Sequence, residues 1–168
     1  MKVIKIILIL SILLIFFNRS PSRNSLLHNN VIVSPCDGTV TYANKNKISV
    51  FLSPLDVHVQ YMPIDAYISD IKIVNKNNFK LANTPASAHN EGVRVVFSSK
   101  LGDIIVTQRV GFFVRRIINN IKINDYRKRT SKYGFITFGS RCDIELPYNI
   151  NTCLKKGDYL TGGETKII

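Results

Sequence analysis

The sequence predicts a mainly β protein: a single sandwich- or barrel-like domain with one short helix, preceded by a hydrophobic N-terminal anchor helix. From position 31 onward, short β-branched runs alternate with turn residues, as in all-β domains. The chain has 168 residues, enough for one domain with a substantial core and hardly enough for two. Its first 17 residues are almost entirely apolar, which sets them apart from that domain.

The N-terminal segment reads MKVIKIILILSILLIFF, with charges only at Lys2 and Lys5. A full membrane span needs about 20 apolar residues and the apolar part of a secretory signal about 7 to 15, so the length fits a short anchor or a signal peptide. The flank NRSP at 18–21 lacks the small-x-small pattern of a signal cleavage site. We therefore expect a retained membrane anchor over 1–17, a polar linker over 18–30 and a folded domain over 31–168.

The expected strands are runs rich in β-branched and aromatic residues, bounded by turn residues such as Asp37-Gly38. They cover 31–34, 39–43, 48–52, 57–61, 67–74, 93–98, 104–109, 135–138, 143–146 and 164–168. One segment breaks this pattern, because the apolar residues of 110–121 repeat at helical spacing, with Arg115 and Arg116 on other faces. We expect a short helix there, which either caps the sheet or turns its arginines toward lipid headgroups.

Basic residues dominate the first part of the chain. Lys and Arg number 23 against 11 Asp and Glu, which gives a net charge of +12. Residues 1–139 hold 19 basic and 7 acidic side chains and residues 140–168 hold 4 of each, so all of the net charge precedes Ser140. Such a surface attracts polyanions. Because a hydrophobic leader stands in front and aromatic residues are not interleaved with the basic ones, we expect an anionic membrane as the partner and no nucleic acid.

The cysteines, Cys36, Cys142 and Cys153, form no C-x-x-C pair and are odd in number. We therefore expect neither a disulfide framework nor a metal site. Each thiol is predicted to be a small buried side chain.

A Gly139-Ser140 step lies between two β-like stretches, within FITFGSRCDIELP. Glycine has no Cβ and tolerates strained backbone angles, so a serine that follows it can turn its hydroxyl onto the preceding carbonyl. The chain would then be cut between the two residues. Elimination of the resulting ester would convert Ser140 into an N-terminal pyruvoyl group, a ketone that can form an imine with an amine substrate. The alternative is an ordinary turn at the end of a strand.

Several stretches, in order along the chain, resemble the short-form phosphatidylserine decarboxylases. They are FFNRSPSR at 16–23, SPCDGTV at 34–40, FLSPLDVHV at 51–59, NE at 90–91, VRRI at 114–117, FGSR at 138–141 and GGET at 162–165. These correspond to the family's FFRDPxR, SPADGxV, FxSPLxVHV, NER, ARRI, FGSR and GET elements. The resemblance covers nearly the whole chain after the anchor.

The resemblance implies an enzyme that decarboxylates phosphatidylserine to phosphatidylethanolamine through a pyruvoyl group made from Ser140. The chain would cut itself between Gly139 and Ser140 into a β chain, 1–139, and an α chain, 140–168, that stay together as a heterodimer. A homo-oligomer is left open. The expected location is a membrane, of the bacterial cell-membrane type.

The same resemblance implies roles for individual residues. Ser140, His58 and Asp37 would be catalytic, with Asp37 and His58 assisting the cut and His58 delivering a proton to the substrate carbon after CO2 has left. Substrate contacts would come from the arginines of two motifs, Arg115, Arg116 and Arg141, at the lipid headgroup.

The chain also departs from the family pattern. Longer members carry two histidines in a YHxxHMP-like segment, whereas this chain has His58 at the first position and Tyr61 at the second, so the base that activates Ser140 stays open. Ser20, Cys36 and Gly92 replace the family's acidic residue, alanine and arginine. Three alternatives remain: an archaetidylserine decarboxylase with the same headgroup chemistry, a lipid-binding relative that never cuts itself, and a secreted basic β domain that binds nucleic acid or glycans.

Overall fold

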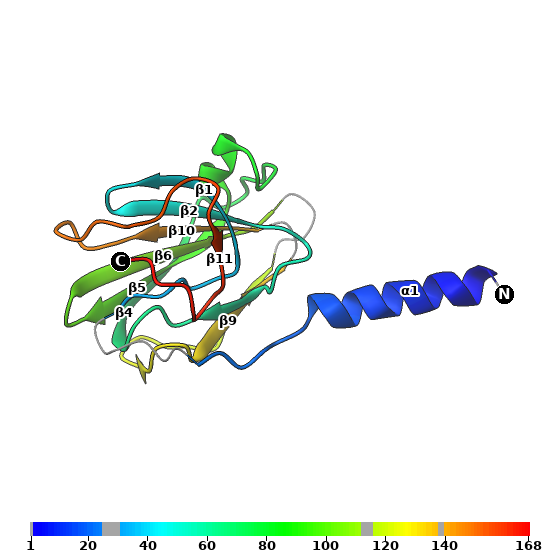
Figure 1. The fold of residues 1–168 in the computed structure, drawn as a ribbon, viewed down its shortest axis with the longest axis horizontal. Helices are drawn as coiled ribbons and strands as arrows, with labels where there is room; N and C mark the ends of the chain where they lie inside the picture. The colour runs from blue at the N-terminus through cyan, green and yellow to red at the C-terminus, as the bar shows by residue number, and fades with distance from the viewer. Residues whose placement is uncertain (1, 25–30, 112–115, 138–139) are drawn as a thin grey trace.

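The computed structural model describes residues 2–24, 31–111, 116–137 and 140–168. A single α-helix among these residues, α1 (Lys2–Phe17), projects from a body of antiparallel strands (Figure 1). The strands form two sheets, one large and one small. The prediction of a mainly β domain behind a hydrophobic N-terminal helix is confirmed.

An eight-stranded sheet forms most of the domain, in the order β11-β1-β2-β10-β6-β5-β4-β8. Its strands are β1 (Gly38–Asn44), β2 (Lys47–Leu52), β4 (Ala66–Val74), β5 (Gly92–Ser99), β6 (Gly102–Arg109), β8 (Tyr126–Arg127), β10 (Ser140–Glu145) and β11 (Tyr159–Leu160). Strands β1 and β2 form a hairpin, as do β5 and β6. Strand β10 comes from the C-terminal part of the chain and inserts between β2 and β6, so this late segment completes the middle of the sheet (Figure 1).

A second sheet has three strands, in the order β3-β9-β7. They are β3 (Val59–Tyr61), β9 (Lys132–Ile136) and β7 (Ile117–Asn119). A short 3-10 helix, η1 (Pro85–His89), lies in the connection between β4 and β5 and contacts β10. The small sheet lies beside the end of the large sheet that α1 approaches (Figure 1).

The hydrophobic core lies on one face of the large sheet. Side chains alternate between the two faces of a strand, so the buried residues of β2 and β10 face the same side, as in the pairs Val50 with Cys142 and Ile48 with Ile144. Burying an aliphatic side chain of this size contributes about 1.5–3 kcal/mol. Cys36 and Cys142 are buried as predicted, whereas Cys153 is exposed, which corrects the prediction for that thiol.

Most expected strands are present. Those expected over 39–43, 48–52, 67–74, 93–98 and 104–109 correspond to β1, β2, β4, β5 and β6, with ends that differ by two residues or fewer. The strands expected over 31–34 and 164–168 are wrong, because these segments meet in a single bridge between Val33 and Lys166. Strands β7, β8 and β11 were not expected, since segments of two or three residues are too short to show a period of two.

The helix predicted over 110–121 is wrong wherever the structure describes this segment. Ile117–Asn119 form β7, which pairs with β9 through Ile117 opposite Ile136 and Ile118 opposite Phe135. Residues 112–115 lie outside the described part of the chain. Isoleucine favours strands as a β-branched residue, and pairing with β9 satisfies the backbone, so tertiary contacts overrode an apolar period that fits a helix.

Helix α1 has 16 residues, a length of about 24 Å. In the described part of the chain, no helix combines the length and the apolar character needed to cross a membrane. Ten of its apolar side chains are nevertheless exposed: Ile4, Ile6, Ile7, Leu8, Ile9, Ile12, Leu13, Leu14, Ile15 and Phe16. At the C-terminal end of the helix, Phe17 is buried against the domain.

Candidate active site

Ser140 is the first residue of β10, the strand that lies between β2 and β6. Its Cα lies opposite Leu52 in β2, and the next residue, Arg141, lies opposite Arg109 in β6. Gly139 lies outside the described residues. The predicted cut therefore falls immediately before a strand that is held from both sides.

His58 immediately precedes β3 and is completely buried. Its Nδ1 lies 2.9 Å from the backbone carbonyl oxygen of Asp56. A carbonyl can only accept, so Nδ1 carries the proton and the neutral ring has its lone pair at Nε2. Nε2 is buried and has no hydrogen-bond partner among the described residues.

The surroundings of His58 favour its neutral form. Burial lowers the pKa of the imidazole below its ordinary value, an effect that the hydrogen bond to Asp56 only partly opposes. The ring of Phe17 packs over it with the centroids 4.4 Å apart, and the ring of Phe135 lies 6.3 Å away. A neutral imidazole with an available lone pair is a suitable general base.

Asp37 is buried in the turn before β1. Its Oδ1 accepts from the N–H of Gly162 at 2.7 Å, and its Oδ2 lies 3.2 Å from Nη2 of Arg23. Burial raises the pKa of this carboxyl, although both partners stabilise its charged form. The bond from Gly162 to Asp37 brings the GGET and SPCDG motifs together. Among the described side chains, Asp37 and His58 share no hydrogen bond.

Tyr61 stands at the position of the second histidine and is fully buried. Its hydroxyl donates to the carbonyl oxygen of Pro21 at 3.0 Å, and burial raises its pKa. Three neighbouring bonds also hold the start of the linker. The Arg19 guanidinium donates to the carbonyl oxygen of Leu55 at 2.6 Å, and the Arg23 guanidinium pairs with the Glu164 carboxylate at 3.4 Å. The Lys132 ammonium donates to the carbonyl oxygen of Ser20 at 2.7 Å. The start of the linker is therefore fixed along the domain, and the end of α1 lies over His58.

A cavity of about 500 Å³ opens next to the end of α1, along the small sheet. Its apolar wall includes Val59, Ile118 and Phe135, and its cationic side chains are Arg116 and Lys132. An apolar wall with two cations suits a ligand that joins an anionic group to a hydrocarbon chain.

Arg116 is attached to the segment that leads to Ser140. Its backbone N–H donates to Oγ1 of Thr137 at 3.2 Å, and its carbonyl accepts from the Thr137 hydroxyl at 2.8 Å. Thr137 precedes Ser140 by three residues. The predicted headgroup residue Arg115 lies outside the described residues.

Arg141 has a different environment. Its guanidinium binds Asp143 at 2.7 Å, Ser49 at 2.9 Å and Ser87 of η1 at 3.2 Å. Asp143 also binds Arg109 at 2.6 Å. The structure thus ties Arg141 into a network beneath η1 and does not place it among the residues that line the cavity beside α1.

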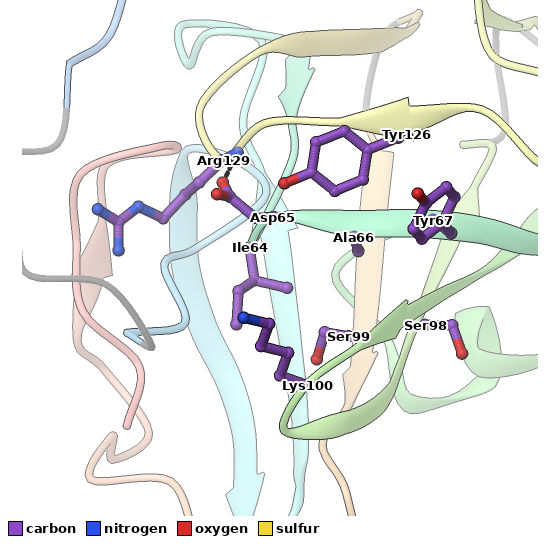
Figure 2. A pocket seen from close by; sticks show the side chains of 9 residues that line it. All are labelled: Ile64, Asp65, Ala66, Tyr67, Ser98, Ser99, Lys100, Tyr126 and Arg129. Carbon is purple, nitrogen blue, oxygen red and sulfur yellow. Dashed lines mark hydrogen bonds between the residues drawn. The ribbon is translucent and has the colours of Figure 1, made fainter.

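A second cavity of about 500 Å³ lies near β4 and β8, where Figure 2 shows its lining side chains. The rings of Tyr67 and Tyr126 lie 5.0 Å apart at one side, and Asp65 accepts from the backbone N–H of Arg129 at 2.7 Å. Neither Asp37 nor His58 lines this cavity. The residue that follows His58, Val59, and Thr137 of the segment that leads to Ser140 line the cavity beside α1 instead.

Sequence reasoning missed three features of the site. Phe17 was assigned to the membrane anchor because the apolar run is continuous, although the ring covers His58. Tyr61 was noted only for the histidine it replaces. Two buried glutamines, Gln60 and Gln108, were passed over, although a polar residue within an expected strand such as 57–61 could have drawn attention to the first.

Comparison with known proteins places the chain among related sequences. A family model described as phosphatidylserine decarboxylase matches residues 41–168. A protein of Methanosarcina mazei, provisionally named an archaetidylserine decarboxylase proenzyme, is 34% identical over 158 residues, which covers 94% of this chain and 76% of that protein. Phosphatidylserine decarboxylase proenzymes of Chlorobium phaeobacteroides and Geotalea uraniireducens are both 32% identical, over 168 and 169 residues, which covers 94% of this chain and 79% of each.

The matched region begins within β1 and ends at the last residue, so it contains every strand of both sheets apart from the first three residues of β1. Of the motifs, only those at 16–23 and 34–40 precede it. The relatives extend the match over nearly the whole chain. This chain therefore belongs to the phosphatidylserine decarboxylase family.

Proposed function

We propose that the protein cuts itself between Gly139 and Ser140 and then decarboxylates phosphatidylserine to phosphatidylethanolamine and CO2 at a membrane surface. The observation that carries the proposal is the position of Ser140 at the start of β10, between β2 and β6. A cut at this point leaves the new N-terminus of the C-terminal piece held within the sheet. The names of the relatives, which are decarboxylase proenzymes, support the same function.

The residues present fit a pyruvoyl group formed from Ser140. The strand fixes the backbone on the C-terminal side of the serine, and a buried base lies nearby in the fold, because Ile136, four residues before Ser140, donates its N–H to the carbonyl of His58 at 3.1 Å. A pyruvoyl group supplies a ketone that takes up an amine and accepts the electron pair left behind by departing CO2.

The first step is an N-to-O acyl shift. The Ser140 hydroxyl attacks the Gly139 carbonyl, the C–N bond breaks and an ester forms, while the hydroxyl proton leaves and a proton is returned to the Ser140 nitrogen. His58 Nε2 has the lone pair that such a transfer requires. Removal of the Ser140 α-proton then expels the Gly139 carboxylate, and water replaces the nitrogen as ammonia.

His58 also serves the decarboxylation. In each turnover Nε2 takes up the proton that the substrate ammonium group loses when its amine joins the ketone, and gives it to the substrate carbon from which CO2 has left. Because burial lowers its pKa, the protonated ring is a stronger acid than an exposed histidine and releases that proton readily. The Phe17 ring excludes water from the exchange.

The cavity beside α1 is the proposed place of the headgroup. Arg116 and Lys132 supply positive charge for the phosphodiester, and the apolar wall accommodates the start of the lipid tails. Phosphatidylserine and archaetidylserine share the phosphoserine headgroup, and the proposal concerns that headgroup. The exposed apolar side chains of α1 and the net charge of +12 provide the two signals that stable membrane attachment needs.

Intact-mass spectrometry of the purified protein tests the proposal. We expect two chains that break between Gly139 and Ser140, with the smaller one lacking a free N-terminal amine, and CO2 release from phosphatidylserine in vesicles. Ser140→Ala should remain one chain and be inactive. A well-folded wild type that stays a single chain of 19.0 kDa contradicts the proposal and favours a lipid-binding relative that never cuts itself. An active Ser140→Ala contradicts the role assigned to Ser140.

A further inference from the structure

Helix α1 exposes apolar side chains on every side. Two unbroken runs of exposed apolar residues occupy positions 6–9 and 12–16. Successive residues of an α-helix point about 100° apart, so each run covers the whole circumference. A helix that is apolar all round belongs in apolar surroundings, and α1 projects away from the body of strands (Figure 1). A bilayer around α1 would therefore bring the end of the domain that carries Phe17 to the headgroups.

A turn at 53–56 is attached to this end of α1. Nη2 of Arg19 donates to the carbonyl oxygen of Leu55 at 2.6 Å, and Nη1 donates to the carbonyl oxygen of Phe16 at 3.0 Å. The same guanidinium lies over the ring of Phe16, with its carbon 3.9 Å from the ring centre. Arg19 thus joins the turn to the last residues of the helix, so whatever surrounds those residues also contacts the turn.

The turn is closed by hydrogen bonds and has an apolar tip. The N–H of Asp56 donates to the carbonyl oxygen of Ser53 at 3.0 Å, and Oδ2 of Asp56 accepts from the N–H of Ser53 at 2.6 Å. Oδ1 of the same carboxylate accepts from the hydroxyl of Tyr159 at 2.8 Å. Between the two closing residues stand Pro54 and Leu55, both exposed, with Leu55 66% exposed.

The backbone of Leu55 is already hydrogen-bonded within the protein. Its N–H donates to Oγ of Ser53 at 3.3 Å, and its carbonyl oxygen accepts from Arg19. In the apolar layer of a membrane no water replaces a missing partner, so an unbonded backbone group there is costly. Leu55 can therefore leave water without losing a backbone hydrogen bond, which is the condition for insertion among acyl chains.

Cationic side chains lie around the same end of the domain. Arg19 holds the turn, and Arg116 and Lys132 line the cavity that opens beside the end of α1. The one carboxylate of the turn, that of Asp56, is buried and bonded to Ser53 and Tyr159. An apolar tip with cations near it complements a bilayer whose headgroups are anionic.

We propose that residues 16–19 and the turn 53–56 form one docking face for a bilayer that contains anionic lipids, with Leu55 inserted among the acyl chains. This inference deepens the proposed function and rests on its membrane partner. His58 follows the turn by two residues, so docking of the turn holds its ring and the cavity beside α1 close to the bilayer. A phospholipid then reaches the cavity while its tails remain in the membrane.

A tryptophan placed at the tip of the turn tests this docking face. The chain has no tryptophan, so Leu55→Trp introduces a single reporter at an exposed position. We expect its emission to shift to the blue on vesicles of phosphatidylcholine and phosphatidylglycerol, and brominated acyl chains to quench it. Phosphatidylglycerol carries no amine, so the measurement does not depend on decarboxylation.

Tyr148→Trp is the matched control. Tyr148 is 97% exposed and follows β10 at the end of the body remote from α1, where Pro147 lies beside Gly102 (Figure 1). Its emission should stay that of a residue in water, without quenching. A vesicle-bound Leu55→Trp that is not quenched, or equal quenching at the two positions, overturns the inference.

Binding strength supplies a second measurement. Leu55→Asp replaces the exposed apolar tip by a charge and should weaken binding to the same vesicles about 10-fold or more, measured by co-sedimentation. Tyr148→Asp should bind like the wild type. Wild-type affinity of Leu55→Asp overturns the docking face and leaves the proposed function intact, whereas a wild-type chain that binds no vesicles removes the membrane from the proposed function as well.

Discussion

At the residue scale, the environment of His58 decides what its ring can do. The carbonyl of Asp56 fixes the proton on Nδ1, and burial beneath Phe17 lowers the pKa of the ring. Both effects point to Nε2 as an atom that first accepts a proton and then returns it. The Asp37 carboxylate is held by other partners, the N–H of Gly162 and the guanidinium of Arg23.

Replacement of His58 should separate cutting from turnover. We expect His58→Ala to cut itself to some extent and to decarboxylate about 100- to 10,000-fold more slowly, the usual contribution of a general acid–base group. CO2 release and gel analysis of the same preparation measure the two steps. Full decarboxylation by the variant would remove His58 from the mechanism.

The pH dependence of cleavage follows from the lowered pKa of His58. The ring must be neutral to accept a proton, so the rate should fall as pH drops through its folded pKa, which lies below the ordinary value of about 6.5. An unfolded chain binds this proton more readily, so His58 also makes the fold less stable as pH falls below about 6.5. Rates measured across pH check the first effect, and an acid limb above pH 6.5 would contradict it.

Asp37 should matter for stability as well as for cutting. Asp37→Ala leaves the Gly162 N–H and the Arg23 guanidinium without their partner, which should lower the free energy of unfolding by about 1–3 kcal/mol. Urea unfolding measures the change. The control Asp70→Ala removes exposed ion pairs with Lys72 and Arg94 and should leave the urea midpoint near that of the wild type. Equal midpoints for the two variants would show that Asp37 has no such structural role.

At the element scale, β7 and β9 connect the cavity beside α1 to the predicted cut. Arg116 precedes β7, and its backbone binds Thr137, which follows β9 and leads to Ser140. The same two strands carry Ile118 and Phe135, which form the apolar wall. Because one pair of strands carries both features, the proposed headgroup site and the segment that leads to Ser140 are positioned together.

Arg116→Gln should therefore weaken headgroup binding without affecting the cut. We expect a several-fold higher KM for phosphatidylserine in mixed micelles, with cleavage and kcat little changed, because the guanidinium contributes charge to the phosphodiester. Lys128→Gln, at an exposed position that does not line the cavity, is the matched control. A variant with unchanged KM would exclude Arg116 from the headgroup site.

At the scale of the whole molecule, the proposed self-cleavage would divide the chain without dividing the fold. The C-terminal piece contains β10 and β11, and β10 pairs along its length with β2 and β6. Cys142, Ile144 and Leu146 of this piece are buried in the core formed with the larger one. Separation would expose this apolar surface and break two ladders of hydrogen bonds, so it carries a large cost in free energy.

We expect the two pieces to migrate together in size-exclusion chromatography and to separate only in denaturant. Replacing Ile144, which is completely buried, by Ala should destabilise the association by about 2–5 kcal/mol and lower the urea concentration at which the pieces part. Tyr148→Ala, at a position 97% exposed in the same piece, is the control. Pieces that separate in native buffer would contradict the shared-sheet architecture.

The sequence by itself determined the type of fold and most strands of the large sheet, and it predicted the reactive segment. These features are local: a period of two over five or more residues predicts a strand, and motifs such as FGSR and SPCDG are contiguous. The apolar character of residues 1–17 is equally local. Each of these features can be recognised without knowing which segments contact one another in the fold.

Only the tertiary structure decided how these segments meet. It showed Ile117–Asn119 as a strand, since pairing with β9 outweighed an apolar spacing that fits a helix. It placed Phe17 over His58 and tied Tyr61 to the linker. It set Gln60 of β3 and Asn119 of β7 opposite Gly134 of β9, on strands that are not consecutive in the sequence. Contacts between distant segments depend on sheet order and register, which a single sequence does not specify through local propensity.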